Sequence, residues 1–341
     1  MMAERKQLRL GIMATGNIAQ QFCNGVRSGG RCALAAVGSR SAASAKAFAE
    51  KFGIPAAHGS YDGLLNDDRV DAVYISLPNS MHHEWTMKAL RAGKHVLCEK
   101  PMAVTVAEAE AMFAEARRAN RVLVEAFMYV SHPQTAHIMK AVEHGVIGEL
   151  RLVRTSFTFR TKRVEGNIRF QPGLAGGALM DVGCYCVNFA RLFARSEVTR
   201  VSAVARLHPT GVDEVTSGTM QFANGVLATF NCGMTTQCDN TAHLCGTEGY
   251  IAVPWPWKPP ATGATYTIAH NVPPRQDQPA ASGPPPKQTV TVDAHAELYA
   301  LEADDFAAAV LDGAPPKVRP EDTLANTRVL EQIRSQIGLS F

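Results

Sequence analysis

Long hydrophobic runs are missing from this chain of 341 residues. No apolar stretch approaches the roughly 20 residues that a membrane-spanning helix needs, so no membrane partner is expected. A strong excess of charge is missing as well, because the formal net charge is only +3 at pH 7. This value is too small to indicate binding to a nucleic acid. The first seven residues are short and charged and do not have the pattern of a signal peptide.

Cysteines with the spacing of a metal site are missing too. The eight cysteines are scattered and include no C-x-x-C pair. Cys184 and Cys186 form a C-x-C motif, but it has no second half with zinc-site spacing. We therefore expect reduced, buried thiols, no metal ion and a cytoplasmic location.

Strand and helix patterns alternate in the first 126 residues. The expected strands are Leu8–Met13, Ala33–Gly38, Ala72–Leu77, His95–Cys98 and Val122–Ala126. The expected helices are Asn17–Arg27, Ser41–Lys51, Met81–Arg91 and Val106–Asn120. This alternation predicts parallel βαβ units and a doubly wound sheet, in a first domain of residues 1–126.

The pattern changes to polar and apolar alternation after about residue 150, which is typical of antiparallel strands. The expected strands are Arg151–Lys162, Val198–Leu207, Val215–Phe222, Val226–Cys232 and Ala242–Cys245, with a hairpin turn at Asn224-Gly225. Two helices, Ala296–Leu311 and Pro320–Ile337, close the chain. Residues 254–288 are rich in Pro, Gly and Ala and predict a long irregular loop. We therefore expect an α+β second domain, residues 127–341.

The turn after the first strand has features of a dinucleotide-binding fingerprint. Ala14 and Ala19 stand at two positions where the ideal motif has Gly or Ala. The backbone N–H groups of such a turn, and the helix N-terminus after it, bind a pyrophosphate. A plain turn is the alternative. The expected cofactor-binding residues here are Gly11, Ala14, Thr15, Gly16, Asn17 and Ile18.

An acidic residue is missing at the end of the second strand, where NAD-binding sheets hold the ribose 2′-hydroxyl. The chain has Ser39 and Arg40 at this position. A guanidinium with a neighbouring hydroxyl suits a 2′-phosphate. The hypothesis is therefore that the cofactor is NADP, with NAD as the less favoured choice. A solvated arginine before a helix is the alternative.

Leu77 ends the third strand, and Asn79 and His82 follow it on the same rim. They are expected to bind the cofactor, with Asn79 and His82 at its nicotinamide end. Asn79 could equally cap the next helix, and His82 could be a satisfied helix-terminal histidine.

Lys100 stands at the end of the strand that begins at His95, and Pro101 follows it. Open α/β sheets bind ligands at the carboxyl ends of their strands. Proline restricts the conformation of the residue before it, which directs Lys100. Glu99 and Lys100 are therefore both expected at the cofactor. A surface lysine that closes a strand is the alternative.

A third group of polar residues lies far along the chain. If a helix begins near Asp181, then Asp181, Tyr185 and Asn188 share one face at i, i+4 and i+7. Such polar residues are unusual on a helix that packs a core. Asp181 as a helix cap and Tyr185 as a packing residue are the alternative.

Taken together, these motifs resemble those of the Gfo/Idh/MocA family of oxidoreductases over nearly the whole chain. Glu99-Lys100-Pro101, residues 176–183 and residues 246–251 match the family pattern. Residues 125–129, 132–134 and 167–169 are most similar to NADP-dependent D-xylose dehydrogenases and dimeric dihydrodiol dehydrogenases.

The resemblance implies an N-terminal Rossmann domain and a C-terminal domain with an open, mostly antiparallel sheet that often forms a dimer interface. It also implies a cis bond between Lys100 and Pro101. Many members have histidine where this chain has Tyr185, and tyrosine resembles the branch that oxidises sugars and diols. The substrate-binding residues would be Lys100, Phe127, Tyr129, Arg169, Asp181 and Tyr185.

The predicted mechanism gives Lys100, Asp181 and Tyr185 the catalytic roles. No side chain accepts hydride, so the oxidation needs a nicotinamide. A free tyrosine has a pKa of about 10, which a lysine ammonium within roughly 4–6 Å would lower. Tyr185 is therefore expected to be the acid/base, with Lys100 lowering its pKa and binding the same oxygen. Asp181 would orient the sugar or the lysine.

The expected reaction is NADP-linked oxidation of a pyranose hydroxyl, at C1 of an aldose such as D-xylose, to give the lactone. The nearest alternatives are a trans-dihydrodiol dehydrogenase and another sugar or keto-sugar reductase. A non-catalytic NADP-binding regulator with the same fold is the alternative from another class. The expected partners are a small sugar or diol and a second copy of the chain.

Overall fold

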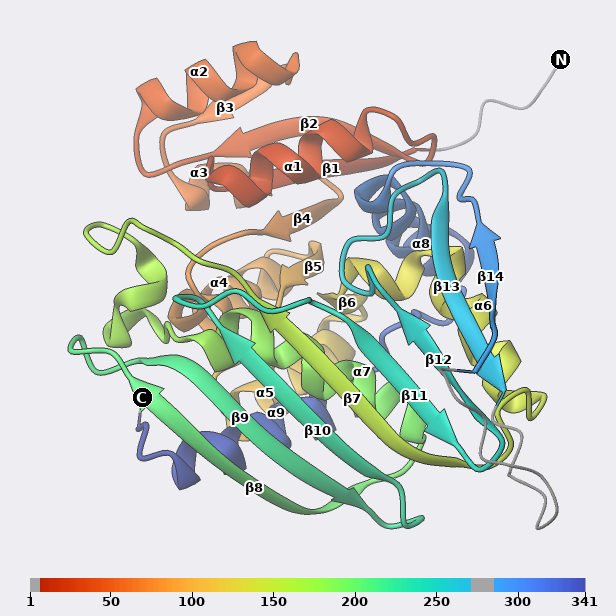
Figure 1. Cartoon of the computed structure of the whole chain (residues 1–341). Helices are drawn as coiled ribbons and strands as arrows, with labels where there is room; N and C mark the ends of the chain where they lie inside the picture. Colours follow the sequence, from red (N-terminus) through yellow and green to blue (C-terminus); the bar gives the residue numbers. More distant parts are fainter. Residues whose placement is uncertain (1–6, 271–284, 341) are drawn as a thin grey trace, which may run out of the picture.

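The computed structural model describes residues 7–270 and 285–340, which form two β-sheets with helices packed on them (Figure 1). The first sheet has six strands in the order β3-β2-β1-β4-β5-β6, all parallel. The strands are β1 (Leu8–Met13), β2 (Cys32–Gly38), β3 (Ala56–His58), β4 (Ala72–Ile75), β5 (His95–Glu99) and β6 (Leu123–Ala126). The helices are α1 (Asn17–Val26), α2 (Ala42–Phe52), α3 (Tyr61–Leu65), α4 (His82–Arg91) and α5 (Val106–Ala119).

The predicted doubly wound sheet is thus confirmed, and the five predicted strands are present with ends shifted by at most two residues. The short elements β3 and α3 were not predicted. With three and five residues, they are too short for a clear period in the sequence.

The second sheet has eight strands in the order β14-β13-β12-β11-β7-β10-β9-β8. Its pairs are antiparallel except for β7 and β10, which run parallel. The strands are β7 (Leu150–Thr158), β8 (Val198–Leu207), β9 (Asp213–Phe222), β10 (Leu227–Gly233), β11 (Ala242–Gly246), β12 (Gly249–Val253), β13 (Ala264–His270) and β14 (Lys287–Val292). The helices of this half are α6 (Pro133–Glu143), α7 (Cys184–Ala194), α8 (Leu298–Asp312) and α9 (Pro320–Gln336).

The prediction of a long irregular loop at residues 254–288 is wrong in part. Strand β13 lies within it, and β14 begins at its end. Along β13, Ala264, Tyr266 and Ile268 are buried and alternate with less buried residues. This period of two is present in the sequence, but the surrounding proline-rich residues concealed it. Residues 271–284 lie outside the described residues.

A helix begins near Asp181, as expected, but its first turn is not an α-helix. A π-helical segment, Leu179–Gly183, contains Asp181 and runs directly into α7 at Cys184. Asp181 therefore does not cap a helix. The i, i+4 relation to Tyr185 spans a change from π to α geometry, and such π turns are frequent at functional sites.

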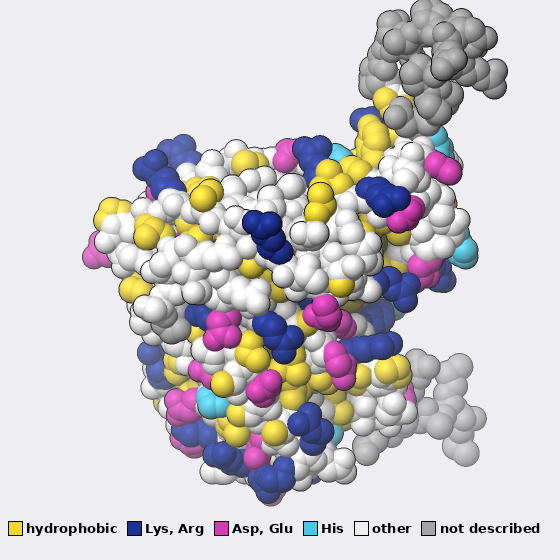
Figure 2. All heavy atoms as spheres, turned by 90° about the horizontal axis from the view of Figure 1, so that it is seen from below, with side chains coloured by type: hydrophobic (Ala, Val, Ile, Leu, Met, Phe, Trp, Pro, Cys, Tyr) yellow, Lys and Arg dark blue, Asp and Glu magenta, His cyan; other side chains and the backbone are white. Residues whose placement is uncertain are grey.

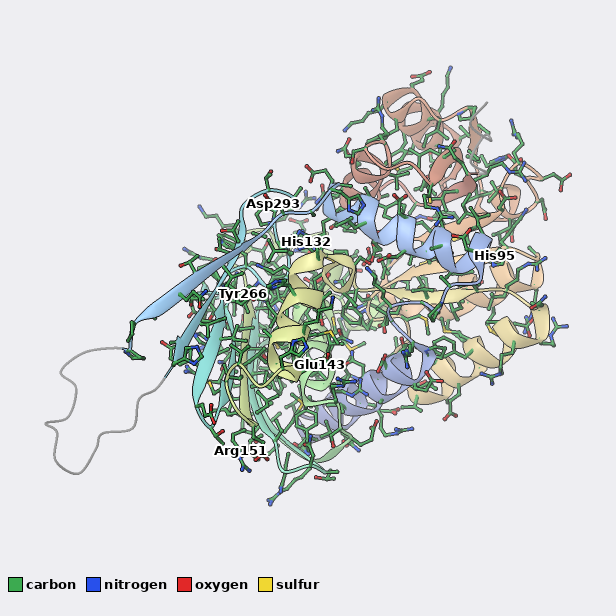
Figure 3. The ribbon with its side chains drawn as sticks, turned by 90° about the vertical axis from the view of Figure 1, so that its right-hand side faces the viewer. His95, His132, Glu143, Arg151, Tyr266 and Asp293 are labelled. Atoms are coloured by element: carbon green, nitrogen blue, oxygen red, sulfur yellow. The ribbon has the colours of Figure 1, made fainter. Side chains whose placement is uncertain are left out.

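Within the described residues, helices cover only one face of the second sheet. Helix α7 packs on β7 and β10, and α9 packs on β8. Figure 1 shows the opposite face of the sheet toward the viewer with no helix over it, and Figure 3 shows α6 and α7 together on the other side.

Helix α8 leaves the second half of the chain and packs against α1, β1 and β2 of the first sheet. The contact is close, because a Cβ added at Gly25 of α1 would lie 2.5 Å from the Cβ of Tyr299. Phe22 of α1 is stacked on Tyr74 of β4 at 3.7 Å between ring centroids and meets the ring of Tyr299 edge-on. The C-terminal part of the chain therefore completes the core of the first sheet.

Positive and negative side chains are interspersed on the face shown in Figure 2 and do not gather into one patch. This distribution agrees with the small net charge of +3. Among the described residues, no helix has the length and apolarity required to cross a bilayer.

His95, at the start of β5, should make folding sensitive to acid (Figure 3). Its Nδ1 accepts a hydrogen bond of 3.0 Å from the backbone N–H of Val122, which requires that atom to be unprotonated. Burial, with help from the charge of Arg121, lowers the pKa of His95 from 6.5 to about 4. The unfolded chain therefore takes up this proton first, and stability is lost as the pH falls from about 6.5 to about 4.

For this half-buried ring we expect a loss of about 1–2 kcal/mol in that range, after allowance for solvent screening. Urea unfolding at several pH values would measure it. His95→Asn keeps an acceptor without the titration and should flatten this part of the profile, whereas His144→Asn, at an exposed helix end, should not. Equal acid slopes for native protein and His95→Asn would contradict the assignment.

Candidate active site

The turn between β1 and α1 has the backbone geometry of a phosphate-binding loop. Ala14 has a φ of +90°, in the left-handed region that favours glycine, and its N–H donates to the carbonyl of Gly38. Gly16, the residue before α1, is extended, and a Cβ added there would meet no atom within 4 Å. The residues present therefore fit a pyrophosphate against the helix N-terminus.

Ser39 and Arg40 lie at the carboxyl end of β2, next to this turn. The Ser39 backbone is tied to His58 of β3 by a hydrogen bond of 3.1 Å, and the residue is buried. Arg40 is exposed, and its guanidinium lies within hydrogen-bonding reach of the Tyr61 hydroxyl. A permanent charge thus stands at the rim where a ribose 2′-phosphate would bind.

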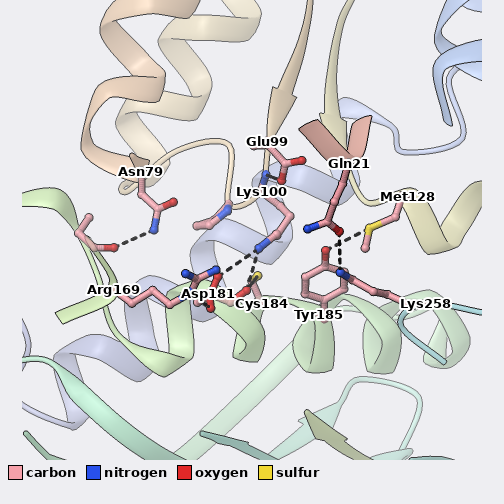
Figure 4. Close-up of polar contacts among 12 residues, drawn as sticks. Gln21, Asn79, Glu99, Lys100, Met128, Arg169, Asp181, Cys184, Tyr185 and Lys258 are labelled. Atoms are coloured by element: carbon pink, nitrogen blue, oxygen red, sulfur yellow. Dashed lines mark hydrogen bonds and ion pairs between the residues drawn. The ribbon is translucent and has the colours of Figure 1, made fainter. Parts of the chain in front are cut away.

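Asn79 connects the two halves of the chain. Its Nδ2 donates to the carbonyl of Ala175 at 2.8 Å, just before the segment that leads into α7 (Figure 4). It does not cap α4, and its contact with the cofactor stays a prediction. Leu77, close by, is buried.

His82 is engaged by protein groups, and its contact with the cofactor stays a prediction. Its side chain is fully buried, with Nδ1 at 2.9 Å from the carbonyl of Pro101 and Nε2 at 2.8 Å from the carbonyl of Leu77. Burial lowers the pKa of His82, so the ring is neutral and donates to one carbonyl at a time. The His82 ring therefore supports the backbone after Lys100. This agrees with the alternative interpretation, in which a histidine at the helix start is hydrogen-bonded within the protein.

Lys100 stands at the centre of the site. The peptide bond to Pro101 is cis, as the family resemblance implied. The Lys100 Nζ donates to the backbone carbonyl of Asp181 at 2.9 Å and lies 3.6 Å from its Oδ1 (Figure 4). It also lies 5.0 Å from the ring centroid of Tyr185. Residues 81 positions apart are thus in direct contact.

Asp181 joins Lys100 to Arg169. Arg169 Nε donates to Asp181 Oδ2 at 2.5 Å, and the guanidinium lies over the ring of Phe159. Burial acts to raise the pKa of Asp181, but the charges of Lys100 and Arg169 outweigh it and the pKa is lowered. Burial likewise acts against the Lys100 charge, yet Asp181 leaves its pKa raised. The lysine is therefore a stable cation at neutral pH.

Tyr185 is buried among aromatic rings from several elements, and its hydroxyl donates to the Met128 sulfur at 3.1 Å. Burial raises its pKa well above 10, and the charge of Glu99 raises it further. The expectation that Lys100 lowers this pKa is therefore wrong. The ammonium lies over the ring and is engaged by Asp181, and burial dominates. Tyr185 is a neutral phenol in this structure.

Phe127 and Tyr129, two predicted substrate-binding residues, lie beside Tyr185. Both side chains are almost completely buried, and the Tyr129 hydroxyl donates to Asn188 Oδ1 at 2.5 Å. Their rings pack on Tyr185, with Phe127 edge-on at 5.2 Å between centroids. These two residues hold the Tyr185 ring in place, and their contact with a substrate stays a prediction.

Two polar residues at the site were not predicted. Lys258, from the segment after β12, donates to Gln21 Oε1 of α1 at 3.3 Å beside Tyr185 (Figure 4). Nothing in the sequence separates this lysine in a proline-rich segment from an ordinary surface lysine. In the described residues, no group of three or more His, Cys, Asp or Glu side chains is arranged to hold a metal ion.

The fold and this site together define a nicotinamide-dependent oxidoreductase. Residues 8–127 match the family model described as "Oxidoreductase family, NAD-binding Rossmann fold", and residues 135–252 match the GFO/IDH/MocA C-terminal domain. The chain belongs to the GFO/IDH/MocA family. Its cofactor is NAD(P), and its relatives act on sugar-related substrates.

Three curated relatives cover most of the chain. The dTDP-3,4-didehydro-2,6-dideoxy-alpha-D-glucose 3-reductase of Actinomadura kijaniata is 35% identical over 98% of this chain and 96% of its own length. The D-xylose 1-dehydrogenase (NADP(+)) 2 of Haloferax volcanii is 33% identical over 96% of both chains. The trans-1,2-dihydrobenzene-1,2-diol dehydrogenase of Mus musculus is 36% identical over 74% of this chain and 76% of its own.

A solved structure has the same fold over nearly the full length. The 3-ketoreductase of Actinomadura kijaniata in complex with NADP and TDP-benzene superposes with a TM-score of 0.86 at 33% identity. The match covers 97% of this chain and 98% of that chain.

Proposed function

We propose that this protein is an NADP-dependent oxidoreductase that oxidises a pyranose hydroxyl, at C1 of an aldose such as D-xylose, to the lactone. The observation that carries the proposal is the position of Lys100. It places a stable cation at the carboxyl end of a Rossmann strand and against the ring of a buried tyrosine. The D-xylose dehydrogenase among the relatives supports the substrate class.

Lys100, Asp181 and Tyr185 divide the chemistry between them. The bound nicotinamide supplies the hydride acceptor. The Lys100 ammonium donates to the reacting oxygen and stabilises negative charge on it. Asp181 and Arg169 fix the direction of the ammonium. Tyr185 is the proposed acid/base, and its raised pKa keeps it as the neutral phenol, the form that donates a proton to a substrate oxygen.

A spectrophotometric screen tests this function. The enzyme would be offered NADP or NAD with a panel of aldoses and trans-diols, and NADPH formation would be followed. We expect the highest kcat/KM with an aldose and NADP. Turnover of cyclic diols alone would replace the proposal with a trans-dihydrodiol dehydrogenase. If no substrate is turned over in either direction, the result would favour a non-catalytic NADP-binding regulator.

Reduction of a keto-sugar is the second candidate, and the protonation of Tyr185 favours it. A neutral phenol can donate a proton directly to an alkoxide, so the site as found is prepared for the reductive direction. The sugar 3-reductase among the relatives supports this direction. NADPH oxidation in the presence of keto-sugars, measured in the same screen, decides between the two directions.

Arg40 is expected to select NADP. Because a guanidinium bound to a phosphate is a charge-assisted pair, Arg40→Ala should weaken NADP binding by about 10- to 100-fold while NAD binding changes little. Fluorescence titration with NADPH and NADH measures both affinities. Arg27→Ala, at the exposed end of α1, is the matched control. An unchanged ratio of the two affinities in Arg40→Ala would remove the assignment.

We also propose that a second copy of the chain covers the bare face of the eight-stranded sheet. Val204 of β8 and Leu227 of β10 are large apolar side chains that are 74% and 50% exposed. Val204→Lys should place a charge in this interface and convert a dimer to a monomer in sedimentation experiments. Val164→Lys, an exposed position off the sheet, should leave the assembly unchanged. A native protein that sediments as a monomer would contradict the proposal.

A further inference from the structure

Lys258 is a second lysine at the active site, on the segment between β12 and β13. Like Lys100, it is followed by a proline, which restricts the backbone of the residue before it. Figure 4 shows its side chain together with those of Lys100 and Tyr185, and the charges of Lys100 and Asp181 act on its ammonium. The residue is exposed, so a ligand can reach it from solvent.

The backbone on both sides of Lys258 is anchored. Trp257 is buried, its indole N–H donates to a backbone carbonyl of β7 at 2.9 Å, and its ring meets Tyr185 edge-on at 6.0 Å between centroids. On the other side, the carbonyl of Pro260 accepts a hydrogen bond of 3.2 Å from His132 Nε2. Lys258 is therefore held at the active site by the packing of its neighbours.

The ammonium of Lys258 has no carboxylate within ion-pair distance among the described residues. It donates to Gln21 Oε1 at 3.3 Å, which is longer than the about 2.7–2.9 Å of a strong charge-assisted hydrogen bond. The same oxygen also accepts a hydrogen bond of 3.4 Å from the Tyr299 hydroxyl. A neutral amide oxygen shared by two donors does not balance a charge, so this contact can be exchanged for one with a ligand.

The carboxylates nearest to Lys258 are engaged elsewhere. Asp181 forms ion pairs with Lys100 and Arg169. Glu99 accepts hydrogen bonds from a buried tyrosine hydroxyl and from the backbone N–H of Lys100. In the part of the site that the structure describes, three cations thus face two carboxylates, and one positive charge is left over.

This surplus charge fits an anion on the substrate better than the cofactor. The pyrophosphate has its own site at the β1–α1 turn. The nicotinamide ring of the oxidised cofactor is itself positive, so it does not balance Lys258. Partial burial and the charge of Lys100 lower the pKa of Lys258, and an anion bound beside the ammonium offsets both effects.

We propose that Lys258 binds a carboxylate or phosphate group of the sugar, so that the preferred substrate is an acidic or phosphorylated aldose. This proposal rests on the proposed function and narrows its substrate class. Lys100 binds the reacting oxygen, and Lys258 binds the charged substituent. Two fixed cations thus orient the sugar ring toward the nicotinamide.

Matched sugars test the proposal. The enzyme and NADP would be offered D-glucose, D-glucuronate and D-glucose 6-phosphate, and NADPH absorbance would give kcat/KM for each. We expect native enzyme to prefer a charged sugar over glucose by about tenfold or more. Lys258→Met should lower this preference by about 10- to 100-fold, the range for a hydrogen bond to a charged group. Lys258→Arg should keep most of it, and Lys140→Met, at an exposed position of α6, is the matched control.

Charge reversal separates recognition from a structural role. Lys258→Glu should shift the preference from glucuronate to glucosamine, the cationic sugar with the same ring, which a folding defect does not produce. Binding of glucuronate to the complex of enzyme and NADPH, followed by NADPH fluorescence, should weaken in Lys258→Met. It should also weaken at high salt in native enzyme.

Three outcomes would count against these ideas, and they are distinguishable. Equal kcat/KM of native enzyme for charged and neutral sugars, or a preference unchanged in Lys258→Met and Lys258→Glu, would overturn the inference and leave the proposed function intact. Weaker NADPH binding in Lys258→Met with an unchanged sugar preference would also overturn it, because the anion would then belong to the cofactor. Failure of native enzyme to oxidise any sugar, charged or neutral, would overturn both.

Discussion

Replacing Lys100 with alanine is expected to lower kcat by about 10²- to 10³-fold, the usual cost of removing one preorganised donor to a developing oxyanion. The ammonium lies where the reacting oxygen must bind, and it is already held by Asp181, so no reorganisation is needed on substrate binding. The affinity for NADPH should change by less than about threefold, because the pyrophosphate site is at the β1–α1 turn. Steady-state kinetics and a fluorescence titration measure the two quantities.

Two controls make this result specific. Lys140→Ala removes a lysine from the last turn of α6, away from the site, and should leave kcat unchanged. Lys100→Arg keeps the charge but alters its geometry, and should retain more activity than Lys100→Ala. A value of kcat within threefold of native in Lys100→Ala would end the role assigned to this residue.

Replacing Tyr185 with phenylalanine is expected to lower kcat by about 10²- to 10⁴-fold, the range for loss of a positioned acid/base. The fold should be unaffected, because the ring stays packed against Phe127, Phe157 and Trp257 and only the contact to Met128 is lost. Thermal unfolding should confirm that stability is retained. Tyr250→Phe on the second sheet, where the tyrosine is part of β12, is the matched control.

The pH profile of the native enzyme tests the same assignment. Because burial raises the pKa of Tyr185 well above 10, its ionisation should produce no inflection in kcat between neutral pH and pH 9. An inflection near neutral pH that disappears in Tyr185→Phe would show that the cofactor or substrate lowers this pKa. Such a result would restore the original hypothesis for Lys100.

The sequence was most informative where its signals are local. Hydrophobic periodicity located the strands of the first sheet. Ser39 and Arg40, in place of an acidic residue, indicated an NADP site at the carboxyl ends of these strands. The strand-terminal Lys100 and the polar residues Asp181 and Tyr185 were also identified, and the structure brings these three together. Their catalytic roles stay predictions.

What the sequence could not give are properties that depend on the surroundings of a side chain. Phe127, Tyr129 and His82 belong to conspicuous motifs, but only the packing shows that their side chains are buried. The sign of the Tyr185 pKa shift likewise depends on where the Lys100 ammonium lies relative to the phenol ring. Lys258 stands in a proline-rich segment, and its unbalanced charge becomes visible only when that segment packs beside Tyr185.

The return of α8 to the first sheet has a consequence for synthesis on the ribosome. Residues 1–126 include all six strands of that sheet, yet Phe22 and Gly25 pack against Tyr299, which is translated far later. An apolar surface of the nascent Rossmann domain therefore stays exposed until nearly the whole chain has been synthesised. Since exposed hydrophobic surface makes folding intermediates prone to aggregation, production of this enzyme should depend on chaperones that bind the N-terminal domain until α8 arrives.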